Sequence, residues 1–368
     1  MNDLRIDRSP GQHFDWTLAG IVSILALMGL VNLVSAAASG VEGGSDIVGR
    51  QMIVLGIGAV VIGVVLVIDY RHYDRFAYVI YAGSVALLLL TLAIAEETRG
   101  ARAWLFSGRF QPSEFAKLGM VIALAHYFGR NPPADIRRLR DLFVPGLLVV
   151  VPVLLIVAQK DLGVALLTLL IGLTLLPLVN VPLRAWIGVA FLGAAGLVAL
   201  WRYGLEGYQQ ERILGFLDPS RDPLASGYQQ IQSRIAVGSG GLLGTGWQEG
   251  TQTQLRFLPT QHTDFAFSVL AEEWGFLGSA LVLVVYAMML LWALLIARNS
   301  KDTFGAALAI GLVGTLLWPA AINVAMVLGL APVIGVPLPL FSYGGSALIS
   351  AALAIGLLLN ISMRRYVF

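Results

Sequence analysis

"FAFSVLAEEWGFLGSALVLVVYAMMLLWALLIA", residues 265–297, has no charged side chain after Glu273. A helix needs about 20 apolar residues to cross the hydrocarbon core of a bilayer, and this stretch provides them. The whole chain has the same character, because 57% of its 368 residues are hydrophobic and 12% are charged. A soluble domain carries about 25% charged residues. The composition therefore predicts a membrane protein.

Nine further segments have a similar character. Together with 265–297, the predicted spans are 17–39, 52–68, 76–95, 113–129, 142–158, 162–181, 185–201, 304–328 and 345–363. Only helices and closed barrels satisfy the backbone in lipid, and the sequence lacks the alternating ten-residue strands of a barrel. We divide 142–181 at "QKD", residues 159–161, since it is about twice as long as one crossing requires. The predicted fold is an all-α polytopic membrane protein with ten transmembrane helices.

The arginines and lysines predict the orientation. With the N-terminus inside, the inner segments hold thirteen of them and the short outer loops hold five, as the positive-inside rule requires. Both termini are therefore expected in the cytoplasm. Residues 203–264 then form a large extracytoplasmic loop between the seventh and eighth spans, inside a single domain of residues 1–368. Within that loop, residues 228–237 are expected to form a short amphipathic helix at the outer interface.

Several familiar kinds of site are missing from the sequence. The chain has no cysteine, which excludes disulfides, thiol nucleophiles and cysteine-ligated metals. The four histidines are too dispersed for a zinc site: His13, His72, His126 and His262. "GSGGLLGTG", residues 238–246, matches neither glycine pattern of nucleotide-binding proteins and is expected to be a flexible loop. No basic tract indicates nucleic acid as a partner.

Charged side chains in or beside the predicted spans gather towards the outer leaflet, where a lone charge is costly. "QPSEFAK", residues 111–117, begins the fourth span, and its Glu114 and Lys117 are three residues apart on one helix face. The two side chains form either a buried ion pair that fixes helix packing, or a site in which Lys117 binds a phosphate group and Glu114 orients it. Both interpretations stay open at this point.

Two further charges lie in the outer loops. Arg102, in "GARAWLFSGRF" (100–110), either anchors the interface beside Trp104 or binds an anionic head group. Asp161, in "QKDLG" (159–163), either caps the sixth span or belongs to the same site as the other charges.

Asp264 is the strongest candidate for chemistry. It follows His262 in "LPTQHTDFAF", residues 258–267, and it could simply cap the eighth span. The next outer loop, however, contains "PLPLFSYGGSA", residues 337–347, whose irregular backbone needs a protein-lined or wet cavity. A cavity with a carboxylate, a lysine and an arginine on one side is suited to a phosphorylated lipid. At least one of Glu272 and Glu273 is expected to pair with a neighbouring helix instead.

These motifs, taken in order, resemble those of the SEDS family of cell-wall proteins. They are "GARAW…FQPSEFAK", "QKDLG", "FLDPSRDPLASGYQQIQS", "GSGG", "FLPTQHTDFAFSVLAEEWGFLG" and "NVAMVLGLAPVIGVPLPLFSYGGSA". The resemblance covers about residues 100–360. "GTQTQLRFLP" and "FSVLAEEWGF" are more similar to the elongation branch, RodA, than to the division branch, FtsW.

The resemblance implies a peptidoglycan glycosyltransferase of the bacterial inner membrane, acting in cell elongation and shape maintenance. It would use lipid II and work with a class B penicillin-binding protein of the elongation machinery. By motif position Asp264 is the family's essential acid, and Arg102, Glu114, Lys117, Asp161 and His262 are candidates for contacts to the diphosphate or sugar. Asp264 would act as a base or hold a divalent cation such as Mg²⁺.

Two departures from the family's pattern are visible. Thr260 stands where glutamate is common, which weakens the case for a second carboxylate at a metal. Lys160 replaces a usual proline before Asp161. Two other functions remain as alternatives. A lipid II transporter should need polar residues along its whole path, for which Glu272, Glu273 and His126 are the candidates. A non-catalytic scaffold for the partner enzyme should tolerate the loss of Asp264.

Overall fold

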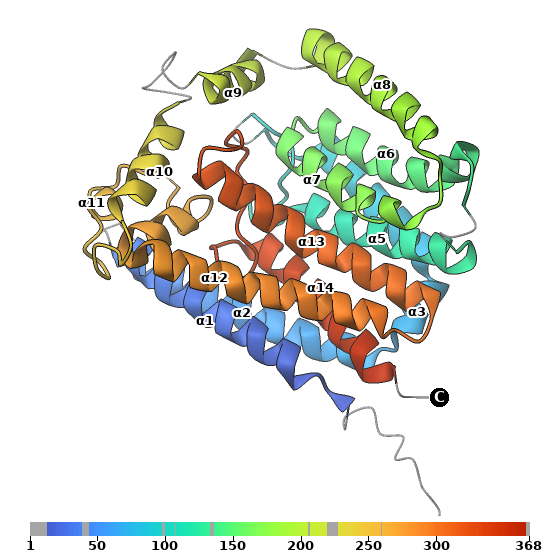
Figure 1. Cartoon of the computed structure of the whole chain (residues 1–368), viewed down its shortest axis with the longest axis horizontal. Coiled ribbons are helices and arrows are strands. Elements are labelled where there is room, and N and C mark those ends of the chain that lie inside the picture. Colours follow the sequence, from blue (N-terminus) through green and yellow to red (C-terminus); the bar gives the residue numbers. More distant parts are fainter. Residues whose placement is uncertain are drawn as a thin grey trace, which may run out of the picture.

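The computed structural model describes residues 13–38, 44–97, 100–106, 108–132, 136–204, 207–218, 227–258 and 260–365. Apart from one isolated antiparallel bridge between Leu105 and Phe110, the regular structure in these ranges is helical. The α-helices are α1 Trp16–Ala38, α2 Gly44–Val67, α3 Tyr70–Arg75, α4 Ala77–Ile94, α5 Pro112–Arg130, α6 Phe143–Ala158, α7 Leu162–Leu173, α8 Leu183–Ala199, α9 Gly207–Leu217, α10 Tyr228–Ser239, α11 Thr251–Gln254, α12 Ala266–Arg298, α13 Thr303–Val327 and α14 Gly345–Arg364. Figure 1 shows α1, α2, α12, α13 and α14 side by side.

Each of the ten predicted spans coincides with a helix. In the described part of the chain, seven helical segments are long and apolar enough to cross a membrane, namely α1, α2, α4, α12, α13, α14 and the segment Leu139–Ala158 that contains α6. The predicted span 162–181 is helical over a shorter length than expected, because α7 ends at Leu173. The structure thus confirms an all-helical polytopic membrane protein.

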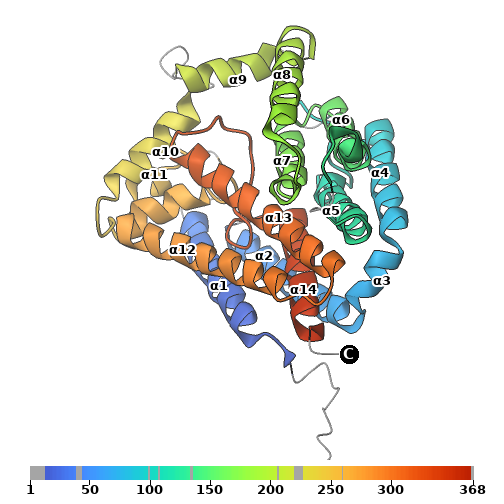
Figure 2. The same cartoon turned by 45° about the vertical axis from the view of Figure 1, so that its right-hand side comes forward.

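Helix α14 forms the centre of the bundle, and 83% of its apolar 18-residue stretch is buried. It lies between α2 and α13, as Figure 2 shows from a second direction. Close approach to α2 depends on Gly356, where an added Cβ would come within 3.3 Å of the α2 backbone at Ile62. The N-terminal end of this buried helix reaches the candidate site, and its C-terminal end lies at the opposite end of the bundle.

Helix α12 is broken at Gly275, so residues 265–297 do not form the single continuous helix that the sequence predicts. Gly275 has φ 62° and ψ −159°, a backbone conformation that favours glycine. An added Cβ there would also meet the backbone nitrogen of Gly244 at 2.3 Å.

Residues 238–246 supply the hydrogen bonds that this break removes. An unbroken helix would join Phe276 to Glu272 and Leu277 to Glu273. Instead, the four groups bond to the glycine-rich segment: Phe276 N–H donates to Gly241 O (2.9 Å), Leu277 N–H to Leu242 O (3.1 Å), Thr245 N–H to Glu272 O (3.0 Å) and Gly246 N–H to Glu273 O (3.1 Å). The prediction of a flexible loop at 238–246 is therefore wrong, because the glycines allow backbone-to-backbone contact with α12.

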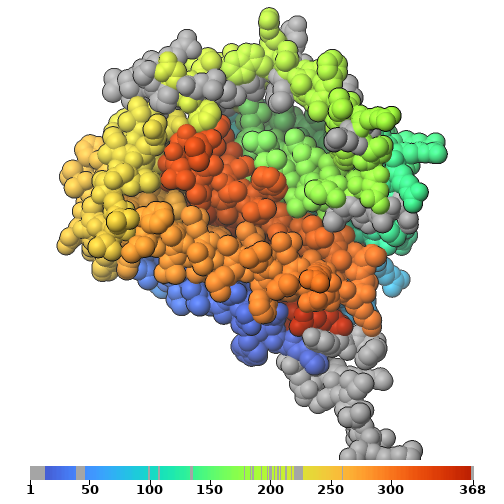
Figure 3. All heavy atoms as spheres, in the orientation of Figure 1, coloured from blue at the N-terminus to red at the C-terminus, as the bar shows by residue number. Residues whose placement is uncertain are grey.

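The segments on either side of this loop pack on α12 as well. Helix α10 fulfils the prediction of a helix at 228–237, and Ser233 Oγ donates to Val327 O on α13 (2.8 Å). The buried carboxylate of Glu272 accepts hydrogen bonds from the N-terminus of α11, and Glu273 accepts one from Ser35 on α1. Both glutamates therefore have structural partners, as expected for at least one of them. Figure 3 shows the yellow residues of α10 and α11 directly against the orange residues of α12.

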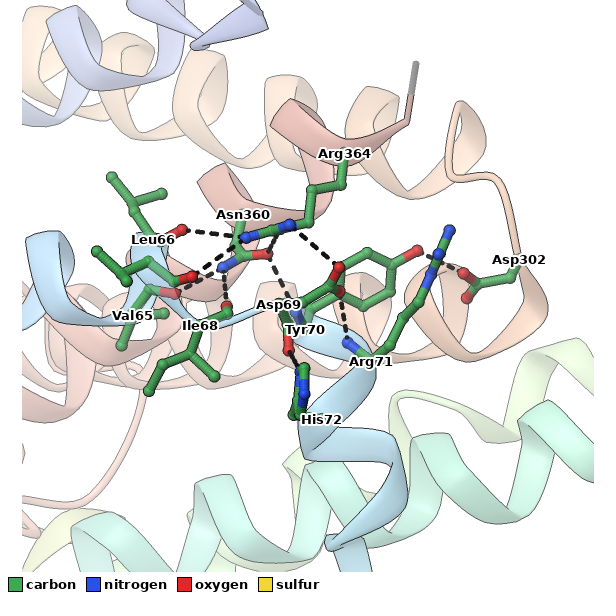
Figure 4. A network of polar contacts seen from close by, with 11 residues as sticks. Val65, Leu66, Ile68, Asp69, Tyr70, Arg71, His72, Asp302, Asn360 and Arg364 are labelled. Carbon is green, nitrogen blue, oxygen red and sulfur yellow. Dashed lines mark hydrogen bonds and ion pairs between the residues drawn. The ribbon is translucent and has the colours of Figure 1, made fainter. Parts of the chain in front are cut away.

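A polar cluster lies near the C-terminal end of α14 (Figure 4). Asn360 on α14 donates from Nδ2 to Val65 O and Ile68 O at 2.6 Å each. Its Oδ1 accepts from Tyr70 N–H (3.2 Å) and from Arg364 Nε–H (3.0 Å). Every hydrogen-bonding atom of this buried amide is thus used, and three of the four bonds fix α14 to the junction between α2 and α3.

Candidate functional site

Glu114 and Lys117 form a buried ion pair near the start of α5. Pro112 occupies the first turn of the helix, where its missing N–H costs nothing. Lys117 Nζ lies 2.7 Å from Glu114 Oε1, and the two side chains are 4% and 11% exposed. Ser350 on α14 donates to Glu114 O (3.1 Å) and ties the start of α5 to α14. The predicted pairing is confirmed.

The pair lines a small, partly open cavity. The other walls come from α13, from the loop between α13 and α14, and from the first turns of α14. Their residues are Thr315, Pro319, Val336, Pro337, Pro339, Ala347, Ser350 and Ala351. The loop between α13 and α14 thus provides the wall that faces the ion pair, as its proline-rich sequence suggests.

Asp161 lies next to this pair, at the start of α7. Its Oδ1 accepts from Val164 N–H (3.2 Å), which confirms that it caps the helix, and its Oδ2 accepts from Gln111 Nε2–H (3.0 Å). Burial raises the pKa of the Asp161 carboxyl; the nearby charge of Glu114 raises it further, while Lys117 opposes both. The N-termini of α5 and α7 therefore bring three charged side chains together.

Lys160 has a backbone conformation that explains why it is not a proline. Its φ is 65°, whereas the proline ring fixes φ near −65°. Its N–H also donates to Val157 O (2.9 Å), a bond that proline cannot make.

Arg102 lies at the edge of the site and does not line the cavity. Its backbone N–H donates to Gln159 O (2.9 Å), which places residue 102 beside the turn that leads to Asp161. Its guanidinium is about half exposed and lies 3.7 Å from the Glu97 carboxylate, a weak surface pair. The side chain is therefore accessible to a ligand from outside.

Asp264 is half-buried and does not cap α12, because the N-cap position is Phe265 and makes no side-chain cap bond. The alternative in which Asp264 serves only as an N-cap is therefore wrong. Its segment is fixed through the main chain. His262 O accepts from Tyr343 N–H (3.0 Å), and the two rings meet edge to face at 6.0 Å. Asp264 O accepts from Asn323 Nδ2–H (2.8 Å).

The loop between α13 and α14 connects Asp264 to the other candidates. Gly335 faces the carboxylate, since a Cβ at that position would lie 3.5 Å from Asp264 Oδ2. Ile334 contacts Gly163 on α7, where a Cβ would lie 2.8 Å from Ile334 O. Val336 lines the cavity together with the Glu114–Lys117 pair. The structure thus gathers four of the predicted residues (Asp264, Glu114, Lys117 and Asp161) around one loop, with His262 beside its end and Arg102 at the margin.

Sequence reasoning missed the neutral residues that hold this arrangement. Gln111 contacts Asp161, and Asn323 contacts the main chain of Asp264. A polar residue inside an otherwise apolar span, such as Asn323, is a signal for an interhelical hydrogen bond. The partner at Asp264, however, lies 59 positions away along the chain.

The carboxylate arrangement limits what metal could bind. In the ranges that the structure describes, no group of three histidine, cysteine, aspartate or glutamate side chains could hold a metal ion. Mg²⁺ commonly binds through one or two carboxylates together with substrate phosphates and water. A single carboxylate such as Asp264 fits a cation of that kind and does not fit a metal held by protein ligands alone.

The comparisons with known proteins decide the family. A model of the cell cycle protein family FtsW/RodA/SpoVE matches residues 15–367. The chain belongs to this family. The resemblance drawn from the motifs is confirmed over almost the whole length of the chain.

Individual relatives agree with the family match. The chain is 41% identical to the peptidoglycan glycosyltransferase MrdB of Escherichia coli K12, over 96% of this chain and 94% of that protein. It is 36% identical, with a TM-score of 0.81, to a solved chain of a peptidoglycan synthase complex that coordinates polymerization and crosslinking. It is 32% identical, with a TM-score of 0.71, to the rod shape determining protein RodA of Thermus thermophilus. Each structural match covers 96% of this chain and 98% of the solved one.

Proposed function

We propose that this chain is a peptidoglycan glycosyltransferase of the RodA/MrdB type, which polymerises glycan strands from lipid II. The observation that carries the proposal is the position of Asp264. In a chain 41% identical to a peptidoglycan glycosyltransferase, its carboxylate faces Gly335, beside the loop that lines the Glu114–Lys117 cavity. Its biological role would be cell elongation and maintenance of cell shape, together with a class B penicillin-binding protein that crosslinks the product.

The reaction transfers the glycan part of a diphosphate-linked lipid to a sugar hydroxyl. The bond between the donor's anomeric carbon and its phosphate oxygen breaks, and a bond from that carbon to the acceptor oxygen forms. The hydroxyl proton passes to Asp264, and the lipid diphosphate leaves with the electron pair. Direct displacement converts an α-linked donor into a β-linked product. The diphosphate supplies the activation, so no nucleotide is needed.

The charges near Asp264 have different tasks in this scheme. Arg102 is exposed and can pair with the leaving diphosphate at the outer edge. Lys117 is already paired with Glu114, so its net attraction for an anion is reduced unless the pair opens. In the alternative to its role as base, Asp264 would hold a divalent cation such as Mg²⁺, which would supply positive charge for the leaving group. Asp264 would then be its only carboxylate ligand, in keeping with threonine at position 260.

The topology that goes with this function has ten membrane crossings, formed by α1, α2, α4, α5, α6, α7, α8, α12, α13 and α14. Helices α7 and α8 are short for a crossing, and α5 contains the ion pair. Both termini would lie in the cytoplasm of the inner membrane. The site, in a single domain of residues 1–368, would lie on the extracytoplasmic side beside the 203–264 loop, where lipid II is used.

Glycan synthesis from purified lipid II tests the proposal. The full chain is reconstituted with its penicillin-binding partner, and product length is compared for wild type, Asp264→Asn and Asp46→Asn. Asp46 is a matched control, because it is an exposed aspartate near the start of α2 that pairs with Arg50. We expect long glycan from wild type and Asp46→Asn, and none from Asp264→Asn with folding and partner binding intact.

Three other results would contradict the proposal. Equal product from wild type and Asp264→Asn would remove Asp264 from the chemistry. Absence of glycan from every variant, together with movement of lipid II across vesicles, would identify a transporter. Absence of both, with the partner's crosslinking stimulated, would identify a scaffold.

A further inference from the structure

Asn323 is a buried amide that joins the two segments on which the candidate site depends. It lies on α13, is 0% exposed, and donates from Nδ2 to Asp264 O (2.8 Å) and Val336 O (2.6 Å). One carbonyl belongs to the residue with the candidate catalytic carboxylate, and the other belongs to the cavity wall. A single nitrogen thus sets the spacing between the two segments.

The position of Gly335 shows why that spacing matters for chemistry. Gly335 precedes Val336, has φ 70°, and faces Asp264 closely enough that an added Cβ would lie 3.5 Å from Oδ2. A shift of Val336 relative to Asp264 would therefore move the carboxylate relative to the wall that faces Lys117. Displacing a reacting group by about 1 Å can cost 10²-fold in rate.

The hydrogen bonds of Asn323 differ from those of an amide that only stabilises the fold. Asn360 likewise donates hydrogen bonds from Nδ2 to two carbonyls, near the C-terminal end of α14, and its Oδ1 accepts two further hydrogen bonds. Within the described ranges, no donor is bonded to the buried Oδ1 of Asn323. Burying an unsatisfied acceptor lowers stability, so the fold gains less from Asn323 than from Asn360.

We propose that Asn323 is a positioning residue, which holds the Asp264 carboxylate at the correct distance from the cavity wall during glycosyl transfer. The inference rests on the proposed function, and it adds a residue to that site which touches neither substrate nor reacting atoms. Asn323 acts through the main chain of Asp264 and Val336. Its loss should lower kcat and leave the KM for lipid II unchanged, because substrate contacts are made by other groups.

Kinetics of three variants test the role, with the full chain in complex with its partner and rates given per folded, partner-bound molecule. Asn323→Asp is isosteric but turns an acceptor towards two carbonyl oxygens, and Asn323→Ala removes the amide without adding charge. Asn360→Asp is the matched control at the cytoplasmic end. We expect kcat to fall about 10- to 100-fold in both Asn323 variants, with KM unchanged, and kcat to stay at the wild-type value in Asn360→Asp.

The outcomes separate this inference from the proposed function. If wild type polymerises, Asp264→Asn does not, and both Asn323 variants keep the wild-type kcat, the positioning role is refuted while the function stands. An equal loss of kcat in Asn360→Asp would refute it too. Failure of both Asn323 variants to fold would also refute it, because the role of Asn323 would then be structural. If wild type makes no glycan, the proposed function fails first.

Discussion

Substitution of the two adjacent buried glutamates of α12 should lower stability by very different amounts. Glu272 is 0% exposed, and its carboxylate accepts from Gln252 N–H (2.7 Å), Thr253 N–H (3.0 Å) and Thr253 Oγ1–H (2.7 Å). Both carboxylate oxygens therefore face donors. Glutamine at this position must turn its NH₂ group towards at least one of those donors, since it has only one acceptor oxygen.

The expected magnitude follows from the number of bonds lost. A hydrogen bond to a charged group contributes about 1.5–3 kcal/mol, and an unsatisfied buried donor costs a further penalty. The less costly orientation of the amide places its nitrogen at the oxygen that faces Gln252, which removes one bond and leaves one buried N–H unsatisfied, so Glu272→Gln should cost about 3–5 kcal/mol. Glu273 accepts a close hydrogen bond from Ser35 through one oxygen, and among the described residues only the Gln248 N–H approaches the carboxylate as a second, weaker donor. Glutamine fits that pattern, and Glu273→Gln should cost less than about 1 kcal/mol.

Thermal unfolding of the detergent-solubilised protein, followed by scanning fluorimetry, measures the difference. At about 2 °C per kcal/mol for a large domain, Glu272→Gln should lower the Tm by about 6–10 °C and Glu273→Gln by less than about 2 °C. The pair is its own control, because the two changes are chemically identical and adjacent. Equal shifts in the two variants would show that the N-terminal cap of α11 does not decide stability in this region, and the reasoning would fail.

Substitutions at three further positions test the backbone and the site. Gly275→Ala should lower the free energy of unfolding by about 3 kcal/mol or more in chemical denaturation, because a side chain there combines a positive φ with a 2.3 Å contact to the Gly244 nitrogen; a change under about 1 kcal/mol would contradict the break. Lys160→Pro should be destabilising by a similar amount in the same assay, since φ is 65° and the N–H bonds to Val157 O, whereas Lys160→Gly should be neutral or stabilising. The raised pKa of Asp161 means that the folded state binds a proton at higher pH than the unfolded chain, so unfolding free energy should fall as pH rises from 3.8 to the folded pKa. Asp161→Asn should remove this slope, of at most about 1.4 kcal/mol per pH unit, in Tm measurements against pH.

Apolar run length located the helices well, because the bilayer imposes one length on every crossing. The span predicted at 304–328 is observed at Thr303–Val327, and that at 142–158 at Phe143–Ala158. The cap at Asp161 was also readable, since aspartate before an apolar run has one common local role. These features depend on neighbours in the chain.

The features that could not be read depend on contacts between distant segments. A glycine inside an apolar run is usually just part of a helix. Only the backbone hydrogen bonds from residues 241–246 show that Gly275 breaks α12. The same reason hid Asn323, whose two acceptors come from different loops. The charged residues that the structure brings together could be picked out from the sequence, whereas the neutral residues that arrange them became visible only in the fold.

The break at Gly275 also settles a question of length. Thirty-three residues in one straight helix would extend about 50 Å, far more than the roughly 30 Å of hydrocarbon that a span must match. Ending the crossing at Phe276 leaves about 35 Å of helix, a length that moderate tilt accommodates. Residues 266–274 therefore do not have to match the thickness of the bilayer. The segment that follows Asp264 can thus contain two glutamates and take its position from protein contacts, so that membranes of different thickness would change the tilt of α12 without moving the site.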